Sequence, residues 1–249
     1  MTESVIGFII VIITAAAILV LSSRRIREAF PPAFRSITGI TNLRRAIDLS
    51  VEDGSRVHVS VGNADLTETT NASALVGLSS LHRIGQLSTT SDLPPICTSG
   101  DGGTALLSKD VLHAVAKETN TRETYNGDQG YLTGSNPFSF ALGAMDVIAD
   151  PAVKTNVFIG NFGAEAGFLS TAAEKETTTV LAASDSIVAQ AIFMATSRDV
   201  LIGEELFAIP AYLGYKPAHS ASLQVQDYLR LIISAALLIG ALLKVMGVI

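Results

Sequence analysis

Long apolar runs lie at both ends of the chain, and shorter patterned segments fill the middle. Residues 5–21 read VIGFIIVIITAAAILVL, without a charged side chain. Residues 231–249 read LIISAALLIGALLKVMGVI, with Lys244 as the only charge. At 1.5 Å per helical residue, each run crosses most of a hydrocarbon core of about 30 Å. The pattern therefore predicts a transmembrane helix at each end of the sequence.

A cleaved signal peptide is the alternative interpretation of the first run. A signal peptide needs a basic segment ahead of its apolar residues, whereas Thr2, Glu3 and Ser4 precede this run and arginines follow it. We therefore interpret the run as a permanent anchor. In the second run, Lys244 lies close enough to the end for its side chain to reach the lipid headgroups.

Between the two runs, strand-like apolar segments alternate with segments of helical apolar spacing. The expected strands are 57–61, 95–98, 156–160, 178–183 and 200–202, and the expected helices are 72–87, 104–118, 138–148, 164–175, 186–196 and 204–213, the last as far as Pro210. Such alternation is typical of βαβ units with a mainly parallel sheet. The sequence predicts a Rossmann-like or flavodoxin-like three-layer sandwich but does not indicate the strand order.

Two further segments complete the predicted organisation. Residues 43–51 fit a short helix or a strand, and the Gly-, Asn- and Ser-rich residues 125–137 fit a long loop. The expected parts are a transmembrane helix in residues 1–23, a basic juxtamembrane linker in 24–54, an α/β domain in 55–227 and a second transmembrane helix in 228–249. Pro31 and Pro32 in the linker stop a helix from continuing out of the first span.

Positive charge is concentrated directly after the first apolar run. The arginines there are Arg24, Arg25, Arg27, Arg35, Arg44 and Arg45. Because basic residues flank the cytoplasmic ends of transmembrane helices, we expect the α/β domain in the cytoplasm and both chain termini outside. We also expect these arginines to contact the anionic membrane surface.

The domain itself is acidic, with 9 basic and 21 acidic residues between Ala46 and Leu229. This balance excludes the basic footprint that nucleic-acid binding needs. The single cysteine, Cys97, excludes an intrachain disulfide and fits a small buried side chain better than a nucleophile.

Small and polar residues follow three of the predicted strands. They are Gly62, Asn63, Gly100, Asp101, Gly102, Gly160, Asn161 and Gly163. Ligands of open parallel sheets bind at the carboxyl ends of strands, so these residues are candidates for binding a nucleotide or another phosphate-containing ligand. The alternative is structural, because tight βα turns need small residues for their backbone angles.

Chemical motifs are otherwise lacking in the sequence. The four histidines have no metal-ligand spacing, and neither a phosphate-binding P-loop nor a G-x-S-x-G elbow is present. We therefore predict no catalytic or metal-ligating residue and no particular cofactor, while enzymatic activity stays open.

The stretch VEDGSRVHVSVG, the helix containing ALVGLSSL and the segment PPICTSGDGG resemble an uncharacterised family of bacterial membrane proteins. The resemblance implies an α/β domain between N- and C-terminal spans, in a prokaryotic inner membrane. It implies no activity and no site residues, although His58 falls within the matching pattern.

Two functions from different classes fit these features. The first is a structural protein that self-assembles into a homo-oligomer on the cytoplasmic face of the membrane and scaffolds other membrane proteins. The second is a membrane-bound enzyme or sensor that binds its ligand at the strand ends. A channel or transporter fits poorly, because the two spans contain no acidic residue.

Overall fold

The computed structural model describes residues 2–29, 31, 33–64, 71–121, 125, 127–176 and 178–246. Pro32, residue 126 of the expected loop and residues 247–249 of the second apolar run lie outside the described residues. The chain divides into two compact units: a terminal unit, Met1–Phe34 with Lys216–Ile249, and an α/β unit, Arg35–Tyr215.

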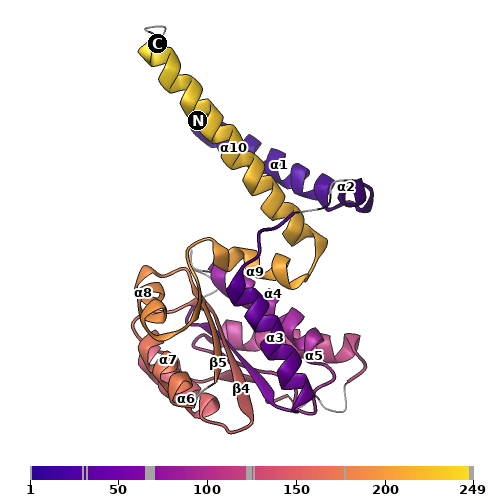
Figure 1. Ribbon diagram of the computed structural model, residues 1–249, viewed down its shortest axis with the longest axis vertical. Helices are drawn as coiled ribbons and strands as arrows, with labels where there is room; N and C mark the ends of the chain where they lie inside the picture. The colour runs from indigo at the N-terminus through magenta and orange to yellow at the C-terminus, as the bar shows by residue number, and fades with distance from the viewer. Residues whose placement is uncertain are drawn as a thin grey trace. The chain divides into compact units, whose positions relative to one another are not determined.

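The terminal unit is helical. It contains α1 (Thr2–Ser22), the short α2 (Arg24–Ala29) and α10 (Pro217–Val245). Both α1 and α10 are long and apolar enough to cross a membrane, and they pack against each other (Figure 1). α10 begins well before the apolar run, with Pro217 in its first turn, where a missing backbone N–H costs no helical hydrogen bond.

The α/β unit is built on a parallel sheet, and six strands are described. They are β1 (Arg56–Gly62), β2 (Ile96–Ser99), β3 (Gly130–Leu132), β4 (Val153–Asn161), β5 (Thr179–Ser184) and β6 (Asp199–Leu201). Their order is β3-β2-β1-β4-β5-β6. The predicted fold class is confirmed, and the order is that of the Rossmann fold rather than of flavodoxin.

Helices cover both faces of the sheet (Figure 1). One layer holds α3 (Thr38–Glu52), α4 (Asn71–Leu87), α5 (Gly102–Glu118) and α9 (Glu205–Leu213), and the other holds α6 (Pro137–Ile148), α7 (Ala166–Lys175) and α8 (Ile187–Thr196). Because side chains alternate along a strand, Val57, Val59 and Val61 of β1 face the first layer. His58, between two of these valines, faces the second.

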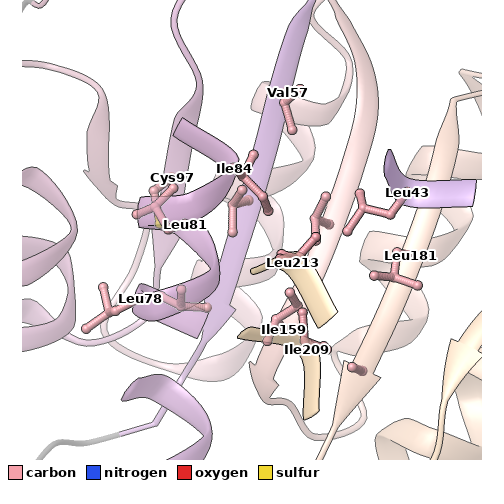
Figure 2. Packing of buried hydrophobic residues seen from close by; sticks show 14 of the residues in the cluster. Leu43, Val57, Leu78, Leu81, Ile84, Cys97, Ile159, Leu181, Ile209 and Leu213 are labelled. Carbon is pink, nitrogen blue, oxygen red and sulfur yellow. The ribbon is translucent and has the colours of Figure 1, made fainter. Parts of the chain in front are cut away.

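The two cores differ in chemistry. The first is aliphatic, and Leu81 and Ile84 of α4 meet Leu213 of α9 there (Figure 2). The second contains the four buried phenylalanines Phe140, Phe158, Phe162 and Phe193. Phe158 and Phe193 stack with ring centroids 5.8 Å apart. A sheet covered on both faces explains why β1 reads as an almost continuous buried run.

α3 belongs to the α/β unit, although its residues were expected in the basic linker. Leu43 and Ile47 are buried in the aliphatic core, which resolves the choice between helix and strand for residues 43–51 in favour of a helix. The compact unit therefore begins at Arg35 rather than at residue 55, and it ends at Tyr215 rather than at residue 227.

Two local predictions were wrong. The expected loop at 125–137 contains β3, a three-residue edge strand whose pairing with β2 is visible only in the assembled sheet. α9 does not end at Pro210 but continues to Leu213 and stops at Gly214, which has a φ of +74°. Proline removes one helical hydrogen bond, and the burial of Ile209 and Leu213 offsets that loss.

Candidate functional site

The strand order places a topological switch point between β1 and β4. From β1 the chain proceeds outward to β2 and β3, and then returns to the other side of β1 as β4. In open α/β sheets, ligands bind at the carboxyl ends of the strands at such a point. Gly62 ends β1 and Asn63 follows it, while Gly160 and Asn161 end β4, so four of the eight predicted ligand residues meet here.

The backbones of β1 and β4 approach so closely at this point that side chains are excluded. A Cβ atom on Gly62 would lie 2.1 Å from the Asn161 carbonyl oxygen, and one on Gly160 would lie 2.0 Å from the Val61 carbonyl oxygen. Gly62 also has a φ of +74°. These glycines are therefore required by the pairing of the two strands, which contains a register shift here.

The side chains beside these glycines bond to one another. Asn63 donates from Nδ2 to Oε1 of Glu165 over 2.8 Å, and the Gly163 backbone N–H donates to the same oxygen over 2.7 Å. The Asn63 amide also fills the space above Gly100, where a Cβ atom would lie 1.6 Å from Asn63 Oδ1. Glu165 is only 3% exposed, so the carboxylate closes the crevice from within.

Glu165 is the central residue of this arrangement, and it was not among the residues predicted from the sequence. An acid just before a helix was a usable signal, because carboxylates are favoured at helix N-termini. The position of Glu165 just before a helix, however, does not reveal that its side chain turns inward to Asn63.

The neighbouring helix N-termini are also occupied. Asp101 accepts a hydrogen bond from the Thr104 N–H at the start of α5, and Ser186 accepts one from the Ala189 N–H at the start of α8. A phosphate bound here would have to displace these caps and face two carboxylates. Of the predicted glycines, only Gly102 has open surroundings: a Cβ atom added there would meet no described atom within 4 Å.

A polar chain crosses the sheet below the switch point. Nδ1 of His58 lies 2.7 Å from Oδ1 of Asn156, and Nε2 of His58 lies 2.9 Å from Oγ1 of Thr98. The Asn156 amide donates to Thr178 Oγ1, which fixes its oxygen toward His58. His58 thus donates from Nδ1 and accepts at Nε2, as a neutral imidazole does.

Burial gives His58 and Cys97 structural rather than catalytic properties. Desolvation lowers the pKa of His58 to about 4. The hydrogen bond to Asn156 raises the pKa, but its effect is smaller than that of desolvation. Burial also raises the pKa of the Cys97 thiol to about 12, so the thiolate that nucleophilic chemistry needs is not formed. The predicted burial of Cys97 is confirmed. Among the described residues, no group of three or more His, Cys, Asp or Glu side chains is placed to hold a metal ion.

The six arginines predicted to contact the membrane surface fall into both units. Arg24, Arg25 and Arg27 belong to α2, and the other three belong to the α/β unit. Within that unit, Arg35 forms an ion pair with Glu205, and Arg44 donates to the Tyr212 backbone oxygen. Arg45 faces a separate hollow at the opposite edge of the sheet.

Exposed apolar side chains surround the carboxyl edge of the sheet. In a parallel sheet every helix that follows a strand begins at that edge. The exposed residues in the first two turns of these helices or directly at strand ends are Leu75, Leu106, Leu107, Leu132, Phe138, Leu142, Phe168, Ile187, Val188, Ile202 and Phe207. Phe138 of α6 and Phe168 of α7 touch edge to face. We call these eleven residues the carboxyl-edge apolar surface.

The fold and its termini define a doubly wound α/β protein with an apolar helix at each end. The chain belongs to the family described as Domain of unknown function (DUF6754), which matches residues 1–249. The expected membership of a family without an assigned function is thereby confirmed. No curated protein and no solved structure matches the chain significantly.

Proposed function

We propose that the protein is a membrane-anchored structural protein that self-assembles laterally into a homo-oligomer on the cytoplasmic face of a bacterial inner membrane. In this proposal α1 and α10 are the transmembrane anchors, and the three arginines of α2 lie at the cytoplasmic surface. The α/β unit is then cytoplasmic and tethered at both ends, with the chain termini outside. Other membrane proteins are candidate clients of such a scaffold.

The carboxyl-edge apolar surface is the observation that carries this proposal. Ile187 is 82% exposed and Phe138 is 58% exposed, values that are unfavourable for large apolar side chains left in water. At the switch point the polar groups of Asn63, Gly163 and Glu165 already bond to one another, so few remain to bind a ligand at this edge. A second protein surface, in contrast, would bury the exposed apolar side chains.

A second copy of the chain is the partner that the architecture favours. Anchors at both ends of the α/β unit keep all copies at the same membrane surface. Confinement of this kind raises the effective concentration of like surfaces and strengthens weak contacts between them.

Helix α8 offers a matched test of self-assembly. We expect the full chain in mild detergent to form one discrete oligomer in native mass spectrometry, and Phe138→Gln combined with Ile187→Gln to dissociate it. Met194→Gln is the control, because Met194 is 59% exposed on the same helix but near its other end. A monomeric wild-type protein, or equal dissociation by the control, would contradict the proposal.

A nucleotide-binding enzyme or sensor is the second candidate, and the Rossmann strand order favours it. Gly102, at the start of α5, is the predicted ligand residue with open space around it. A ligand that approaches this backbone would raise the melting temperature of the wild-type protein and lose that effect in Gly102→Ala. The absence of a shift with a panel of nucleotides and sugar phosphates would leave Gly102 with a structural role only.

A further inference from the structure

A hollow of about 610 Å³ lies at the amino edge of the sheet, on the side away from the switch point. Its walls are α3, the C-terminal parts of α7 and α8, and the beginnings of β5 and β6. Its volume is within the range of about 300–1,000 Å³ that is usual for small-molecule sites. All of its lining residues belong to the α/β unit.

Two guanidinium groups line this hollow. Arg45 lies on α3 and Arg198 follows α8, and both side chains are exposed. Neither has a hydrogen bond or an ion pair within the described part of the chain, in contrast to Arg35 and Arg44. Guanidinium groups bind phosphate and carboxylate oxygens through paired N–H donors, so the hollow is suited to an anion.

Further polar residues line the hollow beside β5 and β6. β6 begins at Asp199, opposite Leu181, so Thr179 and Val180 of β5 extend past it without a strand neighbour on that side within the described residues. The hydroxyl of Ser197, which also lines the hollow, is available to a polar ligand.

Two carboxylates in the same hollow select for a ligand with hydroxyl groups. Asp199 is held in place by the Asn42 amide, which lies 3.0 Å from each carboxylate oxygen. Glu174 is exposed at the rim. Carboxylates repel a simple anion but accept hydrogen bonds from hydroxyls, so a ligand must combine both kinds of group.

We propose that this hollow binds a hydroxyl-bearing phosphate ester, with the phosphate at Arg45 and Arg198 and the hydroxyl groups at Asp199 and Glu174. A free sugar phosphate and the polyol headgroup of an anionic phospholipid share this chemistry. The site is separate from the carboxyl-edge apolar surface, so it does not depend on self-assembly.

Calorimetric titration with ribose 5-phosphate at low ionic strength tests the proposal. The full chain is placed in phosphatidylcholine nanodiscs, and ribose without phosphate serves as the ligand control. We expect saturable binding of ribose 5-phosphate, weakened about tenfold or more in Arg45→Gln and in Arg198→Gln, since each charge-assisted contact contributes that much. Arg198→Lys, which keeps the charge but not the planar fork, is expected to bind with intermediate affinity.

Arg25→Gln is the matched variant control, because Arg25 is an exposed arginine of the terminal unit. It should bind like the wild-type protein, and all variants should keep the wild-type melting temperature without ligand. Repeating the titration in phosphatidylglycerol nanodiscs distinguishes the two sources: competition by the lipid identifies the headgroup, and unchanged binding identifies the soluble ester. Any of three results would overturn the proposal. The first is that the wild-type protein neither binds ribose 5-phosphate nor shows competition by the lipid. The second is that Arg45→Gln and Arg198→Gln bind ribose 5-phosphate as tightly as the wild-type protein, and the third is that ribose binds as tightly as ribose 5-phosphate.

Discussion

At the switch point, β1 and β4 meet in a closed seam, whereas beside β5 and β6 the same sheet leaves an open hollow. The seam consists of Gly62, Gly160, His58 and Asn156. The two glycines are crowded by backbone, and the side chains of His58 and Asn156 are hydrogen-bonded within the protein. The hollow is lined by two arginines that have no partner among the described residues. The difference teaches that the glycines at the ends of β1 and β4 serve the close approach of two backbones, whereas exposed polar side chains at the other edge leave open space.

The largest effect is expected at the seam from Gly160→Ala. The added Cβ atom would lie 2.0 Å from the Val61 carbonyl oxygen, so the two strands would have to separate. We expect a loss of about 3–5 kcal/mol in the free energy of unfolding. Urea unfolding of the full chain, followed by tyrosine fluorescence, measures it. Gly102→Ala is the control and should change stability by no more than about 0.5 kcal/mol; similar losses in both variants would contradict a closed seam.

The next effect is a pH dependence from His58. Its folded-state pKa is lowered from 6.5 to about 4, so the unfolded chain takes up a proton at a higher pH than the folded protein does. The stabilising contribution is complete above pH 6.5 and is lost as the pH falls toward 4, by roughly 3 kcal/mol in total.

Urea unfolding at a series of pH values measures this slope. NMR of the histidine ring protons provides an independent check in the unmutated protein, where His58 should remain neutral at pH 5. A ring that titrates near 6.5 would show that water reaches the seam.

A smaller effect is expected from Glu165→Ala. Removing the carboxylate leaves the Asn63 amide and the Gly163 N–H without their shared acceptor, which costs about 2 kcal/mol. Glu165→Gln keeps an acceptor oxygen and should lose less than half of that. If the alanine variant unfolds at the wild-type urea concentration, the carboxylate is not what closes the crevice.

The smallest effect belongs to the hollow. Arg198→Gln should change the free energy of unfolding by less than about 0.5 kcal/mol, because the side chain is exposed and has no partner in the described part of the chain. The same urea titration measures it. A loss comparable to that of Glu165→Ala would mean that Arg198 stabilises the fold, and the contrast between seam and hollow would then fail.

Local patterns predicted most of the elements but not their partners. The apolar spacing in residues 72–87 was sufficient for α4, since a helix that covers a sheet repeats its buried positions every turn. β3 was missed because three residues carry too little periodicity, and its strand character comes from pairing with β2. Residues 43–51 were recognised as a helix or a strand but assigned to the basic linker, because the burial of Leu43 and Ile47 against the sheet is a tertiary contact.

The candidate site shows the same division more sharply. Gly62, Asn63, Gly160 and Asn161 were correctly expected at strand ends, yet their crowding depends on β1 and β4 being neighbours, and the strand order was not readable from the sequence. Glu165 was missed because its contact with Asn63 joins residues about a hundred positions apart.

The sequence by itself determined the two apolar terminal helices and the alternation of strands and helices, because both depend on the composition and periodicity of contiguous residues. Only the tertiary structure decided which polar groups have partners. Arg44 and Arg45 are adjacent in the sequence, but they point about 100° apart on α3. One reaches the Tyr212 carbonyl oxygen and the other faces the open hollow, because the packing of α3 on the sheet gives its two sides different neighbours.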